Sequence, residues 1–173
     1  MFHNRDNMRN RDIARILYGI ANLLEIKDVP FRPNAYRKAA QNIELLTEDV
    51  EKVYERGELE KIPGVGKNIA EKIKEMLETN SLAYYERLKK EVPVDVEALS
   101  SVEGLGPKKI KMLYSELGIK TLDDLEKAAL EGKIRELKGM GEKTEENILK
   151  NIALARGRGG RGLLGVVLPE AIA

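Results

Sequence analysis

One short pattern, glycine–apolar–glycine, recurs three times in this 173-residue chain and constrains its fold more than any other feature. In each copy an apolar residue stands two positions before the first glycine, and apolar residues follow at helical spacing. The copies are Gly64-Val65-Gly66, Gly104-Leu105-Gly106 and Gly139-Met140-Gly141, and their first glycines lie 40 and 35 residues apart. Three aligned copies indicate a repeated supersecondary unit.

The segments around these glycines have the pattern of short amphipathic helices. Apolar residues recur every three or four positions, as in Ile69, Ile73 and Met76. No segment alternates convincingly in the manner of a strand. Thr47 and Thr121, each followed by acidic residues, are expected to cap helix N-termini. We therefore predict an all-α protein of about nine short helices.

The repeats predict a division into two small domains. We expect a first domain over residues 1–91, a second over residues 92–155, and a linker leading into a further domain over residues 156–173. Pro93 disfavours a helical conformation at Val92 and marks the junction. The last stretch is rich in glycine and arginine and ends in an apolar segment too short to bury itself, so we expect a longer native protein.

The glycine pair of each copy is expected to form a binding site for phosphate. Its middle residue is expected to fill the core between two helices, while the glycines expose the N–H groups that open the second helix. A helix N-terminus of this kind attracts phosphate without reading bases. The pattern resembles the helix-hairpin-helix motif, and the predicted DNA contacts are Gly64, Val65, Gly66, Lys67, Gly104, Leu105, Gly106, Lys108, Lys109, Gly139, Gly141 and Lys143.

The composition fits a local grip on DNA. Thirty Lys and Arg against 29 Asp and Glu give a net charge of +1, which excludes a polycation that coats nucleic acid indiscriminately. The absence of Cys and a single His exclude disulfides, thiolate zinc sites and a Ser-His relay. No apolar run is long enough to span a membrane. We expect a cytoplasmic monomer that associates with the nucleoid of a prokaryote.

Three segments carry a more specific resemblance. NAYRKAA (34–40), IPGVGKNIAEKI (62–73) and VEGLGPKKI (102–110) resemble the N-terminal region of family X DNA polymerases, the DNA polymerase beta type, in its bacterial and archaeal branch. The resemblance implies a lyase-type domain before a DNA-binding subdomain, with gapped, nicked or primer-template DNA as the partner. Mg²⁺ would require the palm domain, whose paired aspartates this sequence lacks.

The same resemblance implies a possible enzymatic site in the first domain. Lys72 matches the lysine that attacks the sugar aldehyde in a 5′-deoxyribose phosphate lyase and forms a Schiff base. The matching pocket residues, which we also expect to contact DNA, are Arg32, Tyr36, Arg37 and Lys38, with the basic groups holding the 5′-phosphate. The chain departs from lyase-active members at Phe31, where they carry His, and at Asn68 and Tyr84, where they carry Lys. Lyase activity is therefore an alternative to DNA binding alone.

The resemblance also implies Na⁺ or K⁺ sites at the hairpins, and no other cofactor is expected in this chain. The ligands would be main-chain carbonyls, of Glu60, Ile62 and Val65 in the first copy and of Ser100, Val102 and Leu105 in the second. Two further readings stay open. The chain could be a tandem helix-hairpin-helix module of another DNA repair protein, or a helical array for protein interaction in which the hairpins only turn the chain.

Overall fold

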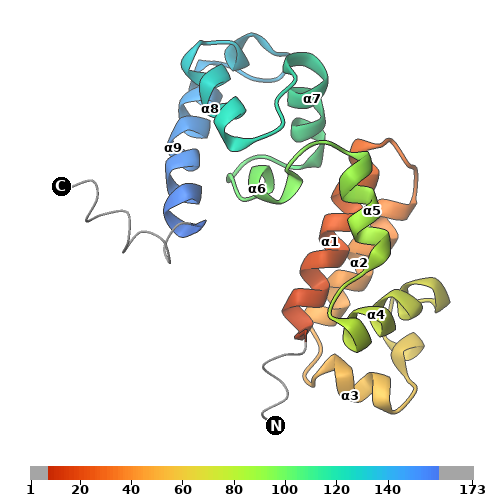
Figure 1. The fold of residues 1–173 in the computed structure, drawn as a ribbon. Coiled ribbons are helices and arrows are strands. Elements are labelled where there is room, and N and C mark those ends of the chain that lie inside the picture. Colours follow the sequence, from red (N-terminus) through yellow and green to blue (C-terminus); the bar gives the residue numbers. More distant parts are fainter. Residues whose placement is uncertain (1–7, 160–173) are drawn as a thin grey trace. The chain divides into compact units, whose positions relative to one another are not determined.

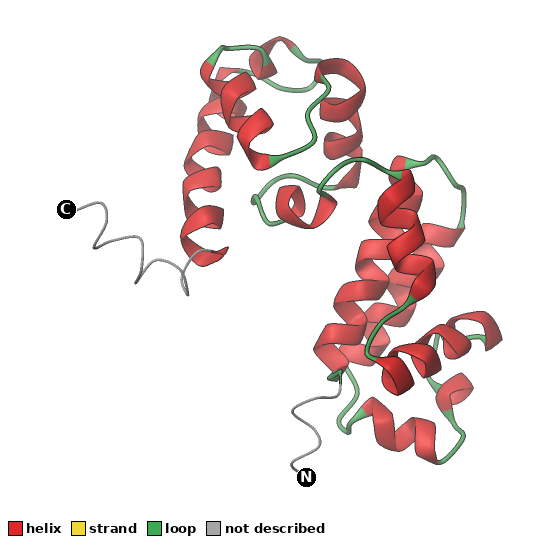
Figure 2. Cartoon of the chain, in the orientation of Figure 1, coloured by secondary structure: helices red, strands yellow, loops and turns green. Residues whose placement is uncertain are grey.

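The structure, a computed structural model, describes residues 8–159 and contains only helices and loops within that range (Figures 1 and 2). This confirms the predicted all-α class. The α-helices of the described part, in chain order, are α1 (Asn10–Ile26), α2 (Arg32–Glu44), α3 (Val50–Glu55), α4 (Lys67–Thr79), α5 (Ala83–Glu91), α6 (Val96–Ser100), α7 (Pro107–Leu117), α8 (Leu122–Leu130) and α9 (Glu142–Gly159). Two short 3₁₀ helices, η2 (Leu59–Lys61) and η3 (Ile134–Glu136), precede the first and third glycine pairs.

The chain divides into two compact units after Pro93. The sequence-based boundary lay two residues earlier, after residue 91. Helix α9 continues to Gly159, into the segment predicted to be a linker. The rest of that segment, residues 160–173, lies outside the described residues.

The first unit is built around α1, which packs along α2 and also contacts α5 (Figure 1). One face of α1 is fully buried, including Ile13, Leu17 and Ile20. Helix α4 adds Ile73 and Met76, which have no exposed surface. The predicted apolar stripes are therefore the residues that form this core.

The second unit packs α6 against α7 and α8 against α9. Its fully buried side chains include Leu99 of α6, Ile110 and Leu113 of α7, and Leu125 of α8. Each short helix contributes only one or two such residues, so the unit depends on the turns that bring the helices together.

One of the two predicted helix caps is correct. The Thr121 hydroxyl accepts a hydrogen bond from the backbone N–H of Asp124 at 3.1 Å and opens α8. The Thr47 prediction is wrong, because α3 begins at Val50 and Asp49 caps it. The Asp49 carboxylate accepts the N–H of Glu51 at 3.1 Å. Both residue types favour the N-cap position, and Asp49 stands directly before the helix.

Candidate nucleic-acid interface

The three glycine pairs fold into the same turn. The first glycine of each pair has a positive φ, of 84° at Gly64, 95° at Gly104 and 82° at Gly139. In each turn the N–H of the middle residue donates to the carbonyl three residues earlier. These hydrogen bonds are Val65 to Ile62 (3.0 Å), Leu105 to Val102 (3.1 Å) and Met140 to Leu137 (3.0 Å). We call the turns with their following helices the first, second and third hairpins.

The second glycine of each pair starts the following helix. Its carbonyl accepts the first helical hydrogen bond: Ala70 donates to Gly66 (2.8 Å), Ile110 to Gly106 (3.0 Å) and Glu145 to Gly141 (2.9 Å). Gly66 and Gly106 are the N-caps of α4 and α7, with φ of −91° and −93°, and no side chain caps either helix.

Neither conformation nor space requires glycine at these two N-caps. Their φ angles are available to any residue. A Cβ at Gly66 or Gly106 would meet nothing within 4 Å. The effect of glycine there is to leave the N–H groups of the first helical turn uncovered. Because these groups carry the positive end of the helix dipole, the two helix starts favour an approaching anion.

The middle residues act as predicted in two of the three hairpins. Val65 is 4% exposed and Leu105 is 6% exposed, so both fill the core under their turns. Met140 is only half-buried. The third hairpin therefore has the backbone geometry of the others with a looser apolar contact.

The third hairpin also differs in charge. No acidic residue lies in the first turn of α4 or α7, whereas the first turn of α9 contains Glu142 and Glu145. The predicted lysines Lys67, Lys108, Lys109 and Lys143 are all exposed. Since carboxylates repel phosphate, Gly139, Gly141 and Lys143 form the least favourable of the three anion sites.

Sequence reasoning missed an ion pair that ties the third hairpin together. Glu145 is 1% exposed, and its carboxylate accepts the backbone N–H of Arg135 at 3.0 Å and its Nε at 2.9 Å. Burial alone raises the pKa of Glu145, but the hydrogen bonds from Arg135 outweigh it and the pKa lies below its ordinary value. The sequence did contain a signal for this burial, because the positions aligned with Glu145 in the other two copies are apolar, Ala70 and Ile110.

Side chains from other helices reach the first two turns. Asn42 of α2 donates to the carbonyl of Pro63 at 2.7 Å, and Lys38 lies against Gly64, where its Cγ would be 3.0 Å from an added Cβ. Asn151 of α9 donates to the carbonyl of Glu103 at 2.9 Å. The sequence predicted Lys38 as a DNA contact and neither asparagine.

A second cluster forms around Lys72, from residues of α2, α4 and α5. The Lys72 ammonium lies 4.7 Å from the centre of the Tyr84 ring and donates to the Asn68 side chain. Arg32 donates to the Tyr84 hydroxyl at 3.3 Å. Arg87, which sequence reasoning missed, lies 5.6 Å from the same ring centre. The positions that depart from lyase-active members, Asn68 and Tyr84, are thus direct neighbours of Lys72.

The environment of this cluster changes two pKa values. Burial, followed by the positive charge of Arg32, lowers the pKa of Lys72 and outweighs the opposing effect of Glu71 and Glu75. Tyr36 is 3% exposed, and burial raises the pKa of its hydroxyl. A lowered lysine pKa means a larger fraction of free amine at neutral pH, which is the form that attacks an aldehyde.

Two predicted pocket residues lie elsewhere. Arg37 forms an ion pair with Glu25 of α1 and also donates to Asn22 and Asn34, both at 3.3 Å. Lys38 contacts the first hairpin. Phe31 stands at the N-cap of α2 with φ 67° and is 87% exposed. Of the four residues predicted with Lys72, the structure therefore brings Arg32 and Tyr36 to the cluster.

The predicted cation ligands belong to matching turns. The Ile62 and Val102 carbonyls each accept one hydrogen bond, from Val65 and Leu105, and retain a second lone pair. In the second hairpin the Lys109 ammonium lies 3.3 Å from the Gly104 carbonyl, so a protein cation already approaches that turn. Within residues 8–159, no group of three or more His, Cys, Asp or Glu side chains is placed to hold a metal ion.

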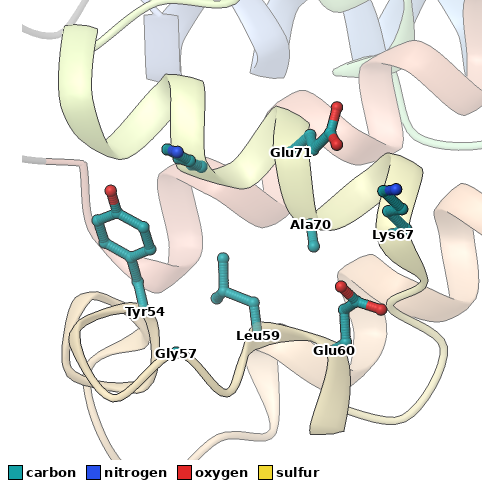
Figure 3. A pocket seen from close by; sticks show the side chains of 8 residues that line it. Tyr54, Gly57, Leu59, Glu60, Lys67, Ala70 and Glu71 are labelled. Carbon is teal, nitrogen blue, oxygen red and sulfur yellow. The ribbon is translucent and has the colours of Figure 1, made fainter.

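An open hollow of about 220 Å³ lies between η2 and α4, next to the first hairpin (Figure 3). Its lining includes the carboxylates of Glu60 and Glu71 and the ammonium groups of Lys67 and Lys74. Because these charges balance, the hollow is not an anion site. The uncovered N–H groups of α4 remain the better candidate on this unit.

Comparison with known proteins connects this geometry to two families. Residues 8–82 match the helix-hairpin-helix domain, and residues 96–153 match a SAM-like helix-hairpin-helix tandem. Over 149 residues, 86% of this chain, the sequence is 38% identical to DNA polymerase/3′-5′ exonuclease PolX of Bacillus subtilis. Over 116 residues, 67% of this chain, it is 30% identical to DNA polymerase lambda of Rattus norvegicus.

The chain spans only part of these relatives, 26% of the first and 19% of the second. The helix-hairpin-helix prediction is confirmed by both family matches. The similarity to two polymerases disfavours an unrelated repair protein and a purely structural array. None of the helices in the described part is long and apolar enough to cross a membrane.

Proposed function

The chain belongs by sequence to the family X DNA polymerases, and we propose that it binds DNA, independently of base sequence, as the N-terminal part of such a repair polymerase. The first and second hairpins provide the grip, through the uncovered N–H groups of α4 and α7. The exposed Lys67, Lys108 and Lys109 add charge-assisted contacts to phosphate. The partner is gapped, nicked or primer-template DNA.

One observation carries this proposal. Glycine occupies the N-caps of α4 and α7, where any residue fits the φ angle and a Cβ would meet no neighbour. Serine, aspartate or asparagine would stabilise these helices slightly better, since their side chains cap the first turn. Glycine instead leaves the amides available to a ligand. The positive dipole end favours a phosphate as that ligand.

The test is the affinity of the chain for a one-nucleotide gapped duplex, measured by fluorescence anisotropy as a function of salt. Two unrelated base sequences should bind within about a factor of two, since phosphate contacts carry no sequence information. With at least one phosphate held per hairpin, the slope of log K against log salt should be about −2 or steeper. An affinity that does not change between low and high salt would contradict the proposal.

The proposal assigns a lesser role to the third hairpin. Glu142 and Glu145 in its first turn oppose a phosphate, so Gly139, Gly141 and Lys143 contribute weakly. We further propose that the chain is monomeric and associates with DNA in the cytoplasm of a prokaryote. A net charge of +1 suits this role, because a few local sites supply the binding.

A second candidate activity is 5′-deoxyribose phosphate lyase chemistry at Lys72. The observation that favours it is the half-buried ammonium of Lys72, whose pKa is lowered by burial and by Arg32. The free amine would add to the C1′ aldehyde, and loss of water from the adduct would give a Schiff base. Solvent would then take a C2′ proton while the 3′-phosphate leaves by β-elimination. Arg32 and Arg87 would hold the 5′-phosphate.

Borohydride trapping on a duplex with a 5′-incised abasic site tests this activity. The wild type should form a covalent adduct, and Lys72→Ala should lose it. Lys74→Ala, two positions along the same helix and exposed, is the matched control and should keep it. No adduct with the wild type, or an equal adduct with Lys72→Ala, would reject Lys72 as the nucleophile.

The monovalent cation sites remain a proposal for the same hairpins. Glu60, Ile62 and Val65, and likewise Ser100, Val102 and Leu105, would offer main-chain carbonyls to Na⁺ or K⁺. The proposal is supported by the shared hydrogen-bond pattern of the two turns. A cation there would sit between carbonyl oxygens and a DNA phosphate, so replacing K⁺ by a bulky organic cation at equal ionic strength should weaken DNA binding.

A further inference from the structure

The first and second hairpins share a contact that the repeat itself does not contain. In each, an asparagine from a helix outside the hairpin donates to the carbonyl directly before the positive-φ glycine. Asn42 of α2 reaches Pro63 at 2.7 Å, and Asn151 of α9 reaches Glu103 at 2.9 Å. The donor precedes its hairpin by 21 residues in one case and follows it by 48 in the other. The same contact is therefore made from opposite directions along the chain.

The geometry of the peptide bond gives this contact a consequence. In a trans peptide, the carbonyl of one residue and the N–H of the next point in opposite directions within one plane. The described peptide bonds are all trans. Holding the Pro63 carbonyl toward α2 therefore turns the Gly64 N–H away from α2, and Asn151 does the same for Gly104. Neither glycine N–H donates to a backbone carbonyl within the described residues.

The third hairpin lacks this contact. No asparagine or glutamine side chain in residues 8–159 donates to the Lys138 carbonyl, although Gly139 has nearly the same φ as Gly64. The turn therefore forms without an asparagine. The contact occurs at the two hairpins whose first helical turns lack acidic residues, and is missing at the one that carries Glu142 and Glu145.

We propose that Asn42 and Asn151 are positioning residues for DNA binding: each fixes one peptide plane so that the N–H of Gly64 or Gly104 is presented to a phosphate. This inference rests on the proposed function. Without the asparagine the turn still forms, but its peptide plane can rotate and the amide is no longer held toward the ligand. Each asparagine thus controls one hairpin.

The test uses the whole chain, labelled with ¹⁵N, and a gapped DNA duplex. Asn42→Leu and Asn151→Leu keep the side-chain size and remove the donor. Each should weaken binding roughly tenfold or more, as expected for the loss of one hydrogen bond to a charged group. In Asn42→Leu the Gly64 amide resonance should no longer shift on adding DNA, while that of Gly104 still does. Asn151→Leu should give the reverse.

Asn147→Leu is the matched control. Asn147 lies four residues before Asn151 on α9, is exposed, and lines together with Asn151 a hollow beside the second hairpin. It should leave the affinity and both glycine shifts unchanged. Asn42→Ala and Asn151→Ala, which remove the donor without adding a charge, decide the question if a leucine variant does not fold.

The outcomes separate this inference from the proposed function. If the wild type binds DNA and the folded Asn42 and Asn151 variants show the same affinity and the same glycine shifts as the wild type, the positioning role alone is overturned. Loss of the DNA-induced shift at only one of the two glycines, in a variant that melts at the wild-type temperature, would support it, because a general loss of stability does not single out one amide. No DNA binding by the wild type would overturn the proposed function and this inference together.

Discussion

The two glycines of a hairpin have different physical roles although they are two residues apart. Gly104, with φ 95°, has a backbone conformation that is unfavourable for any residue with a Cβ. Gly106, with φ −93°, has a conformation that any residue can adopt. The first glycine is required by the turn, and the second keeps the helix start open. Substitutions at the first position should therefore affect stability, and those at the second should affect binding.

Gly104→Ala tests the first of these roles. A Cβ at Gly104 would meet nothing within 4 Å, so the substitution adds backbone strain without a steric clash. We expect the second unit to lose about 1–2 kcal/mol of unfolding free energy. Gly104→Asn should lose less, because asparagine tolerates positive φ better. Urea unfolding curves measure both, and a Gly104→Ala variant as stable as the wild type would contradict the assignment.

At the scale of elements, the third hairpin has an internal ion pair at the helix start, where the first and second hairpins offer a site for phosphate. Glu145 takes the position that Ala70 and Ile110 occupy in the other copies. Its buried carboxylate binds the backbone and side chain of Arg135, while Glu142 binds the same guanidinium from outside at 2.8 Å. These contacts join η3 to the start of α9. The third hairpin thus supports the helix that carries Asn151 to the second hairpin.

This ion pair should make the second unit sensitive to acid. The pKa of Glu145 in the folded chain lies below its ordinary value of 4.5. The ion pair therefore contributes stability above that pH, and the contribution is lost as the pH falls through the lowered value. Glu145→Gln should melt at a lower temperature at pH 7, and its melting temperature should fall less between pH 6 and pH 3. Glu146→Gln, exposed on the same helix, should follow the wild type.

At the scale of the whole molecule, local features were predictable and long-range contacts were not. The glycine pairs, their apolar plugs Val65 and Leu105, and the Thr121 cap follow from neighbouring residues. The predicted cap at Thr47 was wrong because a second residue of capping type, Asp49, stands directly before the helix. Asn42 and Asn151 could not be predicted, since each binds a carbonyl distant in the sequence.

The same distinction applies to the basic residues. Sequence reasoning grouped Arg37 and Lys38 with Lys72. In the folded chain Arg37 pairs with Glu25 of α1, and Lys38 lies against Gly64. Successive residues on a helix point in directions about 100° apart, so neighbours in the sequence serve different surfaces. The partners on those surfaces depend on how α1, α2 and α4 pack.

The central claim is that the uncovered amides at the first and second hairpins hold DNA phosphates. The most direct test compares Gly66→Asp, Gly106→Asp and Gly141→Asp in their affinity for a gapped duplex, with melting temperatures measured alongside. Aspartate is a favoured N-cap, so the folds should be kept. We predict that Gly66→Asp and Gly106→Asp each weaken binding about tenfold or more, while Gly141→Asp changes it little. Equal losses in all three, or no loss at Gly66 and Gly106, would contradict the claim.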